Sequence, residues 1–254
     1  LQFPLLRDLP MERIAVDING QVTGGVLEQA VAGHAITDAN LSLSVNDAGL
    51  DMNGTLALAG IPANLAWRED FRARAPVKTQ LTLNAERFAV AKLAPLLPKE
   101  HDVSAVLTGG DLGGRLELTV RQAGTTGIAV SADLSAAAVT LAPAGWSKPP
   151  GTPAACSFEA VLVKDTLSRI PNAACRAEGL DISARAGFDN TGAVRLVEID
   201  RLAVGRTDAT ATAARAEAGG WDLRIGGRSL DVGPLLRSRG ASTREAAAAT
   251  TRAA

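Results

Sequence analysis

The sequence predicts an all-β fold, a long antiparallel meander with one or two short helices. Apolar and polar residues alternate along many short stretches, turn residues separate these stretches at fairly regular intervals, and helical periodicity is nearly absent. Alternation with a period of two gives a strand one apolar and one polar face. Short turns join neighbouring strands antiparallel, so a meander is the expected topology.

The expected strands are the stretches in which the alternation is regular. Their apolar positions are Leu41, Leu43 and Val45; Leu50, Met52, Leu56 and Leu58; Leu81 and Leu83; Leu116, Leu118 and Val120; Ile128, Val130, Ala132 and Leu134; Phe158, Ala160 and Leu162; Leu180, Ile182 and Ala184; and Trp221, Leu223 and Ile225. Turn residues predict hairpin turns at Asn19-Gly20, Asn46 to Gly49, Gly109 to Gly114, Asp189 to Gly192 and Gly219-Gly220.

Helical spacing occurs in two places. Val90, Leu93 and Leu97 lie at helical intervals within residues 86–97, where Pro95 predicts a short or broken helix. A weaker helical pattern covers residues 229–239. Both segments end in Pro-Leu-Leu, which suggests a degenerate repeat of several strands followed by a helical cap, although chance similarity in a Leu-rich chain also produces such a match.

The chain is therefore divided into five consecutive parts. They are an incoming segment from a preceding repeat (1–11), a first strand group with a short helix near 86–97 (12–142), a connection (143–153), a second strand group of the same continuous sheet (154–237) and a low-complexity tail (238–254). The connection contains Pro-Pro-Gly, which does not continue a strand ladder.

Composition excludes several classes of partner. The net charge is −1 and aromatic residues make up 3% of the chain, with no Tyr. We therefore expect neither nucleic-acid binding nor a polybasic patch for anionic lipid headgroups. The chain shows no signal peptide, so we expect that it begins inside something longer or has been trimmed. No run of about 18 apolar residues occurs, so we expect no membrane-spanning helix.

The two cysteines predict a disulfide. Cys156 and Cys175 lie at equal distances from a turn centred on Asp165-Thr166, so they face each other across the hairpin. Opposed residues of an antiparallel pair are close enough to be bridged. The bridge would place the domain outside the cytoplasm. The alternative is a pair of buried free thiols.

Chemistry-bearing residues are few. His34 and His101 are far apart in the sequence, and no Cys, His or acid cluster has metal-ligand spacing. The glycines from Gly109 to Gly114 lack the Gly-Lys-Ser/Thr ending of a phosphate loop. We therefore predict no catalytic residue, no metal and no cofactor, and we expect that the protein is not an enzyme.

Three segments resemble one protein family. They contain Gly54, Gly60-Ile61-Pro62-Ala63, Leu65, Trp67 and Phe71; Val130-Ser131-Ala132-Asp133-Leu134 and Trp146-Ser147-Lys148-Pro149-Pro150-Gly151; and Leu202, Val204-Gly205-Arg206-Thr207-Asp208, Gly219-Gly220-Trp221, Ser229-Leu230-Asp231 and Pro234-Leu235-Leu236. Together they resemble the AsmA/YhdP/TamB-like envelope proteins of Gram-negative bacteria, in particular the AsmA-like region of YhdP-type proteins. The resemblance covers most of residues 12–237.

The resemblance implies a strongly curved, β-taco-like sheet with an open apolar groove. It implies a segment of an inner-membrane-anchored, periplasm-spanning protein that carries phospholipid acyl chains between the two membranes and supports outer-membrane lipid homeostasis. Its partners would be phospholipid and neighbouring repeats of the same longer chain, with membrane association through other segments. The groove candidates are Leu41, Leu43, Val45, Met52, Leu56, Leu58, Leu81, Leu83, Leu116, Leu118, Val120, Val130, Phe158, Leu162, Ile182, Leu223 and Ile225.

The residues leave one alternative function open. Strands with an apolar face must bury it, either between two packed sheets or by curling around a ligand. A purely structural envelope scaffold with a closed core would satisfy the same alternation. The two alternatives differ in whether the apolar face is accessible to a ligand.

Overall fold

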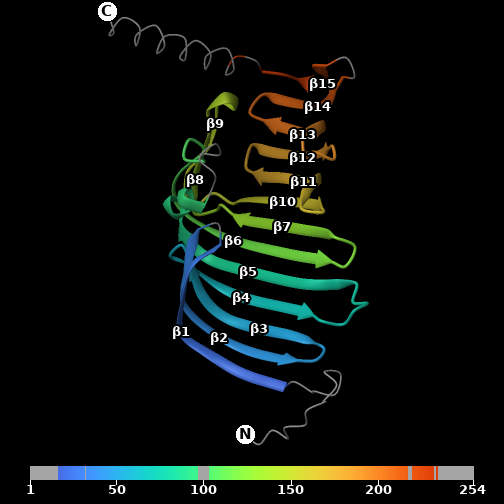
Figure 1. Ribbon diagram of the computed structural model, residues 1–254. Helices are drawn as coiled ribbons and strands as arrows, with labels where there is room; N and C mark the ends of the chain where they lie inside the picture. Colours follow the sequence, from blue (N-terminus) through green and yellow to red (C-terminus); the bar gives the residue numbers. More distant parts are fainter. Residues whose placement is uncertain (1–16, 32, 97–102, 217–218, 232, 234–254) are drawn as a thin grey trace, which may run out of the picture.

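The chain folds as one long antiparallel sheet (Figure 1). The computed structural model describes residues 17–31, 33–96, 103–216, 219–231 and 233. The strands are β1 (Asp17–Val31), β2 (His34–Asn46), β3 (Gly49–Leu58), β4 (Ile61–Asp70), β5 (Val77–Ala89), β6 (Leu107–Arg121), β7 (Thr125–Asp133), β8 (Ala137–Leu141), β9 (Trp146–Lys148), β10 (Ala154–Val163), β11 (Thr166–Ala177), β12 (Leu180–Phe188), β13 (Val194–Val204), β14 (Thr207–Arg215) and β15 (Trp221–Ser229).

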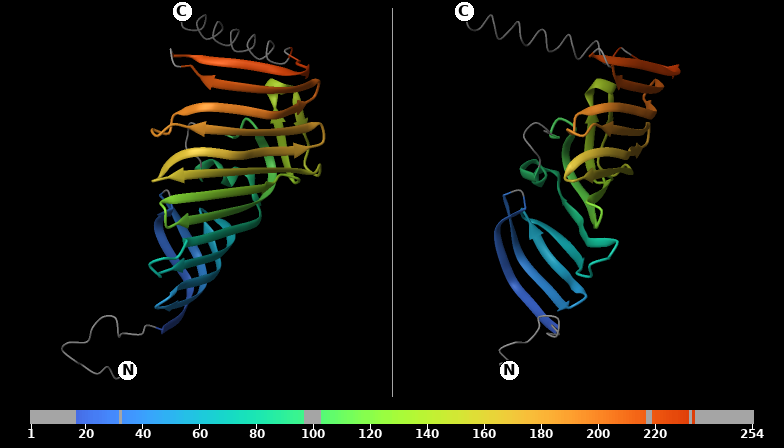
Figure 2. Two further views of the ribbon diagram at one scale, coloured as in Figure 1. Left: turned by 90° about the vertical axis from the view of Figure 1, so that its right-hand side faces the viewer. Right: turned by 45° about the vertical axis from the view of Figure 1, so that its right-hand side comes forward.

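Thirteen of the 15 strands pair in chain order, which confirms the antiparallel meander. Strands β8 and β9 lie off this path, so β7 pairs directly with β10. The path begins at β1 and ends at β15, and the sheet does not close on itself. It is also not strongly curled, so the strong curvature expected from the family resemblance is not observed. Both views in Figure 2 show the open, twisted stack.

The turn predictions have mixed outcomes. Asn46 to Gly49 connects β2 to β3, and the Asn46 side chain accepts hydrogen bonds from the backbone N–H groups of Ala48 and Gly49. Asp189 caps the β12–β13 connection in the same way, and Gly219-Gly220 lies between β14 and β15. The turn predicted at Asn19-Gly20 is wrong, because both residues lie within β1.

The turn predicted at Gly109 to Gly114 is also wrong, since these glycines lie within β6. They are there because other backbone approaches closely. A Cβ on Gly110 would lie 2.3 Å from the carbonyl oxygen of Ala136, and one on Gly113 would lie 2.7 Å from that of Glu86. The glycines let β6 pair with β8 at one end and with β5 and β7 along the rest of its length.

The predicted helix at residues 86–97 is much shorter than its pattern. Strand β5 continues to Ala89, and only two 3₁₀ turns follow, η2 (Val90–Lys92) and η3 (Ala94–Leu96). A third, η5 (Ala142–Ala144), connects β8 to β9. The second helical pattern, at residues 229–239, falls mostly outside the described residues, as do segment 1–11 and the tail 238–254.

Strands β8 and β9 form a small second layer over part of the sheet. The hairpin crosses the direction of the main strands (Figure 2). Strand β9 lies within the segment 143–153, for which the sequence predicts only a connection. The main hydrophobic cluster forms where this hairpin meets the sheet. Its buried members are Val90, Leu112, Leu134, Ala137, Val139, Trp146, Ala154, Leu180 and Val204.

Candidate functional site

The groove candidates all lie on one face of the sheet. Directly opposed residues of an antiparallel pair share a face, and side chains two apart along a strand do too. The pairing register therefore connects every candidate from Leu41 in β2 to Ile225 in β15 on the same side. We call this side the apolar face.

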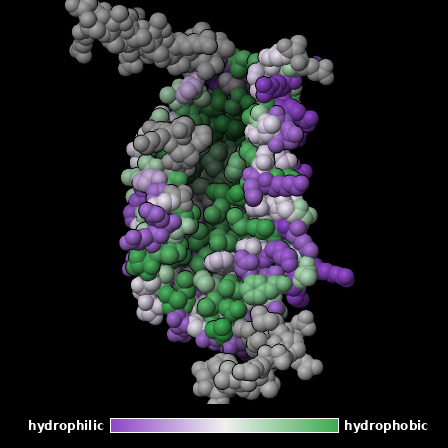
Figure 3. Space-filling model, in the orientation of Figure 1, coloured by the Kyte–Doolittle hydropathy of each residue, from purple (hydrophilic) through white to green (hydrophobic). Residues whose placement is uncertain are grey.

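One row of cross-strand partners runs over the whole sheet and contains no polar side chain. We call it the central row. Its members, from β1 to β15, are Val22, Leu41, Gly54, Leu65, Leu83, Leu116, Val130, Phe158, Ala173, Ala184, Ile199, Ala211 and Ile225. The row runs across the strands, so it follows the long axis of the stack. Figure 3 shows a hollowed apolar surface in this direction, with hydrophilic residues at its sides.

A second row lies beside the central row in the first part of the sheet. It joins Leu43, Met52, Trp67, Leu81, Leu118 and Ile128 through successive pairings. The candidates Val45, Val120 and Leu162 lie one step farther toward the turns that follow β2, β6 and β10. The apolar face is thus several side chains wide.

Most of the apolar face is not covered by protein. Among the candidates only Leu56 is buried, while Val130, Phe158, Leu223 and Ile225 are 36%, 37%, 62% and 54% exposed. The other candidates are half-buried. No large side chain among the described residues is completely buried. An exposed apolar surface of this extent marks a place where something else binds.

The part of the face formed by β2 to β5 has a core of its own. Ala39, Leu56 and Leu65 are buried there without a second layer. They are packed by large neighbours from the same sheet, among them Met52 and Trp67. The Trp67 indole donates a hydrogen bond to the Glu69 carboxylate at 3.1 Å, which the Thr79 hydroxyl also reaches at 3.1 Å. Hydrogen bonds from its neighbours therefore satisfy the Glu69 carboxylate.

The β8–β9 hairpin is held on the sheet by Trp146 and Lys148. Trp146 is 9% exposed, and its indole N–H donates to the carbonyl oxygen of Glu178 at 3.1 Å. The Lys148 ammonium is buried and donates to the carbonyl oxygens of Ala137 at 2.6 Å and Pro149 at 3.1 Å. Burial lowers the pKa of Lys148, and the nearby Asp133 partly opposes this shift. These contacts make the hairpin one wall of the apolar face.

A hollow of about 300 Å³ lies on the apolar face between β7 and β12. Small side chains form much of its floor, including Ala132, Ala173 and Ala184. Val130, Phe158 and Ile182 also line it, so three groove candidates meet at one place. Cys156 and Cys175 also line it, together with Ser157 and Ala174 from the same two strands.

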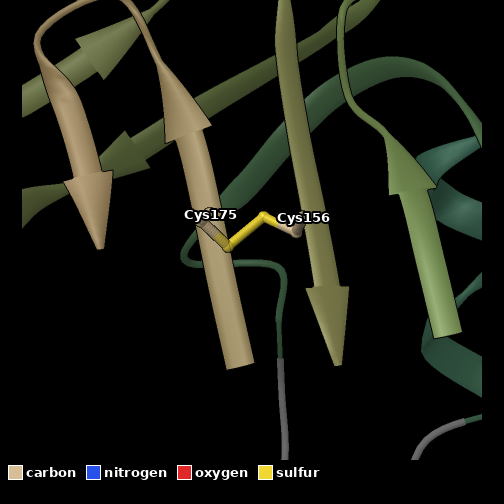
Figure 4. The surroundings of a disulfide bond; sticks show 2 residues. All are labelled: Cys156 and Cys175. Carbon is tan, nitrogen blue, oxygen red and sulfur yellow. A yellow bond between two sulfur atoms is a disulfide. The ribbon is translucent and has the colours of Figure 1, made fainter. Parts of the chain in front are cut away.

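The Cys156–Cys175 disulfide predicted from the sequence is confirmed (Figure 4). It joins β10 to β11 across a pair whose Cα atoms are 4.1 Å apart. The turn, however, is formed by Lys164 and Asp165, both with positive φ, one residue earlier than expected. Two register shifts farther along the hairpin place Cys156 opposite Cys175 despite the earlier turn.

The opposite face of the sheet is polar and carries cross-strand ion pairs. Arg185 pairs with Glu198 at 2.7 Å and with Asp200 at 3.4 Å. The Arg185 guanidinium lowers the pKa of the Glu198 carboxyl through this hydrogen bond. Arg68 pairs with Asp51 at 2.7 Å in the first part of the sheet. These pairs place charged side chains on the polar face of β3, β4, β12 and β13.

The described residues include no group of three or more His, Cys, Asp or Glu side chains placed to hold a metal ion. In the same part of the chain no helix is long and apolar enough to cross a membrane. His34 lies at the start of β2, and His101 falls outside the described residues.

Sequence reasoning missed several members of the central row. Ala173 and Ala211 are small, and Ile199 belongs to a strand whose alternation is interrupted by a β-bulge. Periodicity gives weak signals at such positions. The cross-strand register was the missing information, because it places these residues in line with the Leu-rich strands.

Comparisons of the chain with protein-family models, with curated protein sequences and with solved structures found no match.

Proposed function

We propose that the apolar face binds the acyl chains of phospholipid, and that this chain is one segment of a longer envelope protein that conducts them. The observation that carries the proposal is the central row, which continues over 13 strands without a polar side chain. A ligand with a long apolar tail fits a surface that is apolar in one direction and bordered by polar side chains.

The energetics favour an acyl chain on this surface. Each methylene group that leaves water contributes about 0.8 kcal/mol. The exposed side chains of Val130 and Phe158 would also lose contact with water. The polar headgroup of such a ligand can remain in solvent, because the apolar face is open along its length.

Movement along the face needs no specific polar contact. Successive members of the central row offer similar apolar surroundings, so an acyl chain meets no residue that would hold it at one position. Glu69 is an acid on this face, and its carboxylate accepts hydrogen bonds from Trp67 and Thr79. These hydrogen bonds reduce the free-energy cost of placing an acyl chain beside the carboxylate.

The family resemblance of the sequence supports a periplasmic location for this activity. In this proposal the segment belongs to a longer protein with neighbouring repeats, which is anchored in the inner membrane by a part outside this sequence. Phospholipid would pass between the inner and outer membranes along the connected apolar faces and so support outer-membrane lipid homeostasis. The disulfide is consistent with an oxidising compartment, although only weakly.

Native mass spectrometry of the purified protein, with lipid extraction from the same sample, tests the proposal. We expect co-purified phospholipid with the unaltered chain and a loss of at least about tenfold in bound lipid for Val130→Asp, because a carboxylate on the apolar face is costly to bury against acyl chains. Val130 is 36% exposed, so the fold should tolerate the change.

Ser131→Asp is the matched control. Ser131 is exposed, follows Val130 in β7 and lies on the polar face opposite Ser157. It should leave bound lipid unchanged, and circular dichroism should show the same fold for both variants. A lipid-free, protease-resistant protein would instead favour the structural scaffold with a closed core. Equal loss in the two variants would also contradict the proposal.

A further inference from the structure

Among the described residues, β15 is the last strand of the sheet and its outer edge pairs with no other strand. All nine residues of β15 are exposed. Trp221, Leu223 and Ile225, which share the apolar face, are 50%, 62% and 54% exposed. A regular edge strand with large exposed apolar side chains is a template for pairing with another strand.

The described residues that follow β15 turn away from its outer side. The Ser229 hydroxyl donates to the carbonyl oxygen of Arg206 at 2.7 Å, and the Asp231 backbone N–H donates to the Thr207 hydroxyl at 3.1 Å. Both partners belong to the β13–β14 connection or the start of β14. In the described part of the chain, β14 is the only strand paired with β15.

The first strand differs from the last in ways that discourage pairing. Its register with β2 shifts at three places between Val22 and Val31. Such bulges bend an edge away from a partner. Strand β1 carries the acids Asp17 and Glu28 and no basic residue, so two copies of it would repel one another. The two ends of the sheet are therefore not equivalent.

The sequence of β15 is complementary to itself. From Trp221 to Ile225 it reads apolar, acidic, apolar, basic, apolar. In an antiparallel pair centred on Leu223, each Trp221 opposes the Ile225 of the other strand, and each Asp222 opposes an Arg224. Within the described residues neither Asp222 nor Arg224 has an ion-pair partner.

We propose that β15 is the contact surface for a second copy of this chain, paired antiparallel about a two-fold axis at Leu223. The axis is perpendicular to the sheet, so the apolar faces of the two copies lie on the same side and form one continuous surface. Their central rows are offset along β15, because Ile225 of one copy opposes Trp221 of the other. Two Asp222–Arg224 ion pairs form on the polar face. The contact is the isologous type, in which the same residues serve both subunits.

Joining β15 to the β1 of another copy is the less favourable arrangement. Thirteen strands alternate in direction along the path, so β1 and β15 run the same way. With the apolar faces on one side, β15 and the other copy's β1 would pair in parallel, which is slightly less stable per residue than an antiparallel pair. The acids of β1, Asp17 and Glu28, are also too far apart along the strand for the nine residues of β15 to place a base opposite both.

A charge exchange tests the pairing. Sedimentation equilibrium should show a dimer of the full chain. Asp222→Arg places an arginine opposite Arg224 of the other copy at both symmetric positions. It should raise the dimer dissociation constant about tenfold or more, since like charges opposed across strands are destabilising. The double variant Asp222→Arg/Arg224→Asp exchanges the partners and should restore the dimer. A protein that is monomeric at every concentration, or a double variant no better than the single one, would overturn the proposal.

Crosslinking tests the register. Leu223→Cys brings two thiols together at the axis, so a short bis-maleimide should link the copies in high yield. Ile225→Cys is the matched control on the same face. In this register its two copies lie four residues apart along the strand, roughly 13 Å, and should link poorly. Faster linking at position 225 than at 223, or linking of Ile18→Cys in β1 instead, would contradict the arrangement.

Discussion

The two halves of the sheet bury their apolar face in different ways. From β1 to β7 the central row consists mainly of Leu and Val, and large neighbours such as Trp67 pack beside it without a second layer. From β10 to β15 the row contains three alanines, and the β8–β9 hairpin lies over the adjoining residues. The comparison teaches that an open sheet needs either large side chains or a covering element to stabilise its face.

The largest effect is expected from removing the covering hairpin's anchor. Trp146→Ala should lower the free energy of unfolding by about 3–5 kcal/mol, because the buried indole leaves a cavity and the Glu178 carbonyl loses its donor. Urea denaturation gives the total, and hydrogen exchange should show the loss of protection concentrated in β10 to β13.

Trp67→Ala is the matched change in the other half. Trp67 is half-buried with no layer above it, so its loss should cost about half as much. Equal destabilisation by the two changes would show that the hairpin is not a distinct source of stability.

Removing the disulfide should have an intermediate effect on the stability of the half from β10 to β15, the alanine-rich half. Cys156→Ser/Cys175→Ser releases a link between residues 19 apart, for which chain entropy gives about 3 kcal/mol. The chemical denaturation midpoint should fall, and limited proteolysis should cut first between β10 and β12. An unchanged midpoint would mean that pairing alone holds the hairpin.

The smallest effect is expected at the end of β4, which belongs to the half from β1 to β7, the leucine-rich half. Arg72 lowers the pKa of the Asp70 carboxyl from 3.8 to about 2 by a side-chain hydrogen bond. The folded state therefore gains stability above pH 3.8, and the gain is lost as the pH falls from 3.8 to about 2. Asp70→Asn should abolish this part of the pH dependence in thermal melts. A persistent slope in the variant would assign it to other carboxyls.

The sequence predicts the strands of the leucine-rich half better than the rest of the fold. Alternation places Leu81 and Leu118 on one face because both lie in regular strands. It does not place Ala173 or Ile199, since small residues carry little hydrophobic signal and a bulge separates Ile199 from the regular pairing. The disulfide was predicted with a turn one residue from the true one, and only the register shifts of the hairpin make the pairing correct.

Local sequence patterns do not predict the β8–β9 hairpin. Strand β9 has three residues, Trp146 to Lys148, one of which is a buried lysine. Its position depends on carbonyl oxygens from distant residues and on the glycines that let β6 approach β8. Such contacts are set by the tertiary structure, so a period of two does not reveal them.

Photocrosslinking from both faces of one strand pair tests the central claim most directly. Benzoylphenylalanine placed at Val130 or Phe158 lies on the apolar face, and at Ser131 or Ser157 on the polar face. With radiolabelled phospholipid, we predict covalent lipid adducts from the first two positions and at most background from the other two. Equal labelling of both faces, or none from Val130 and Phe158, would contradict an apolar face that binds acyl chains.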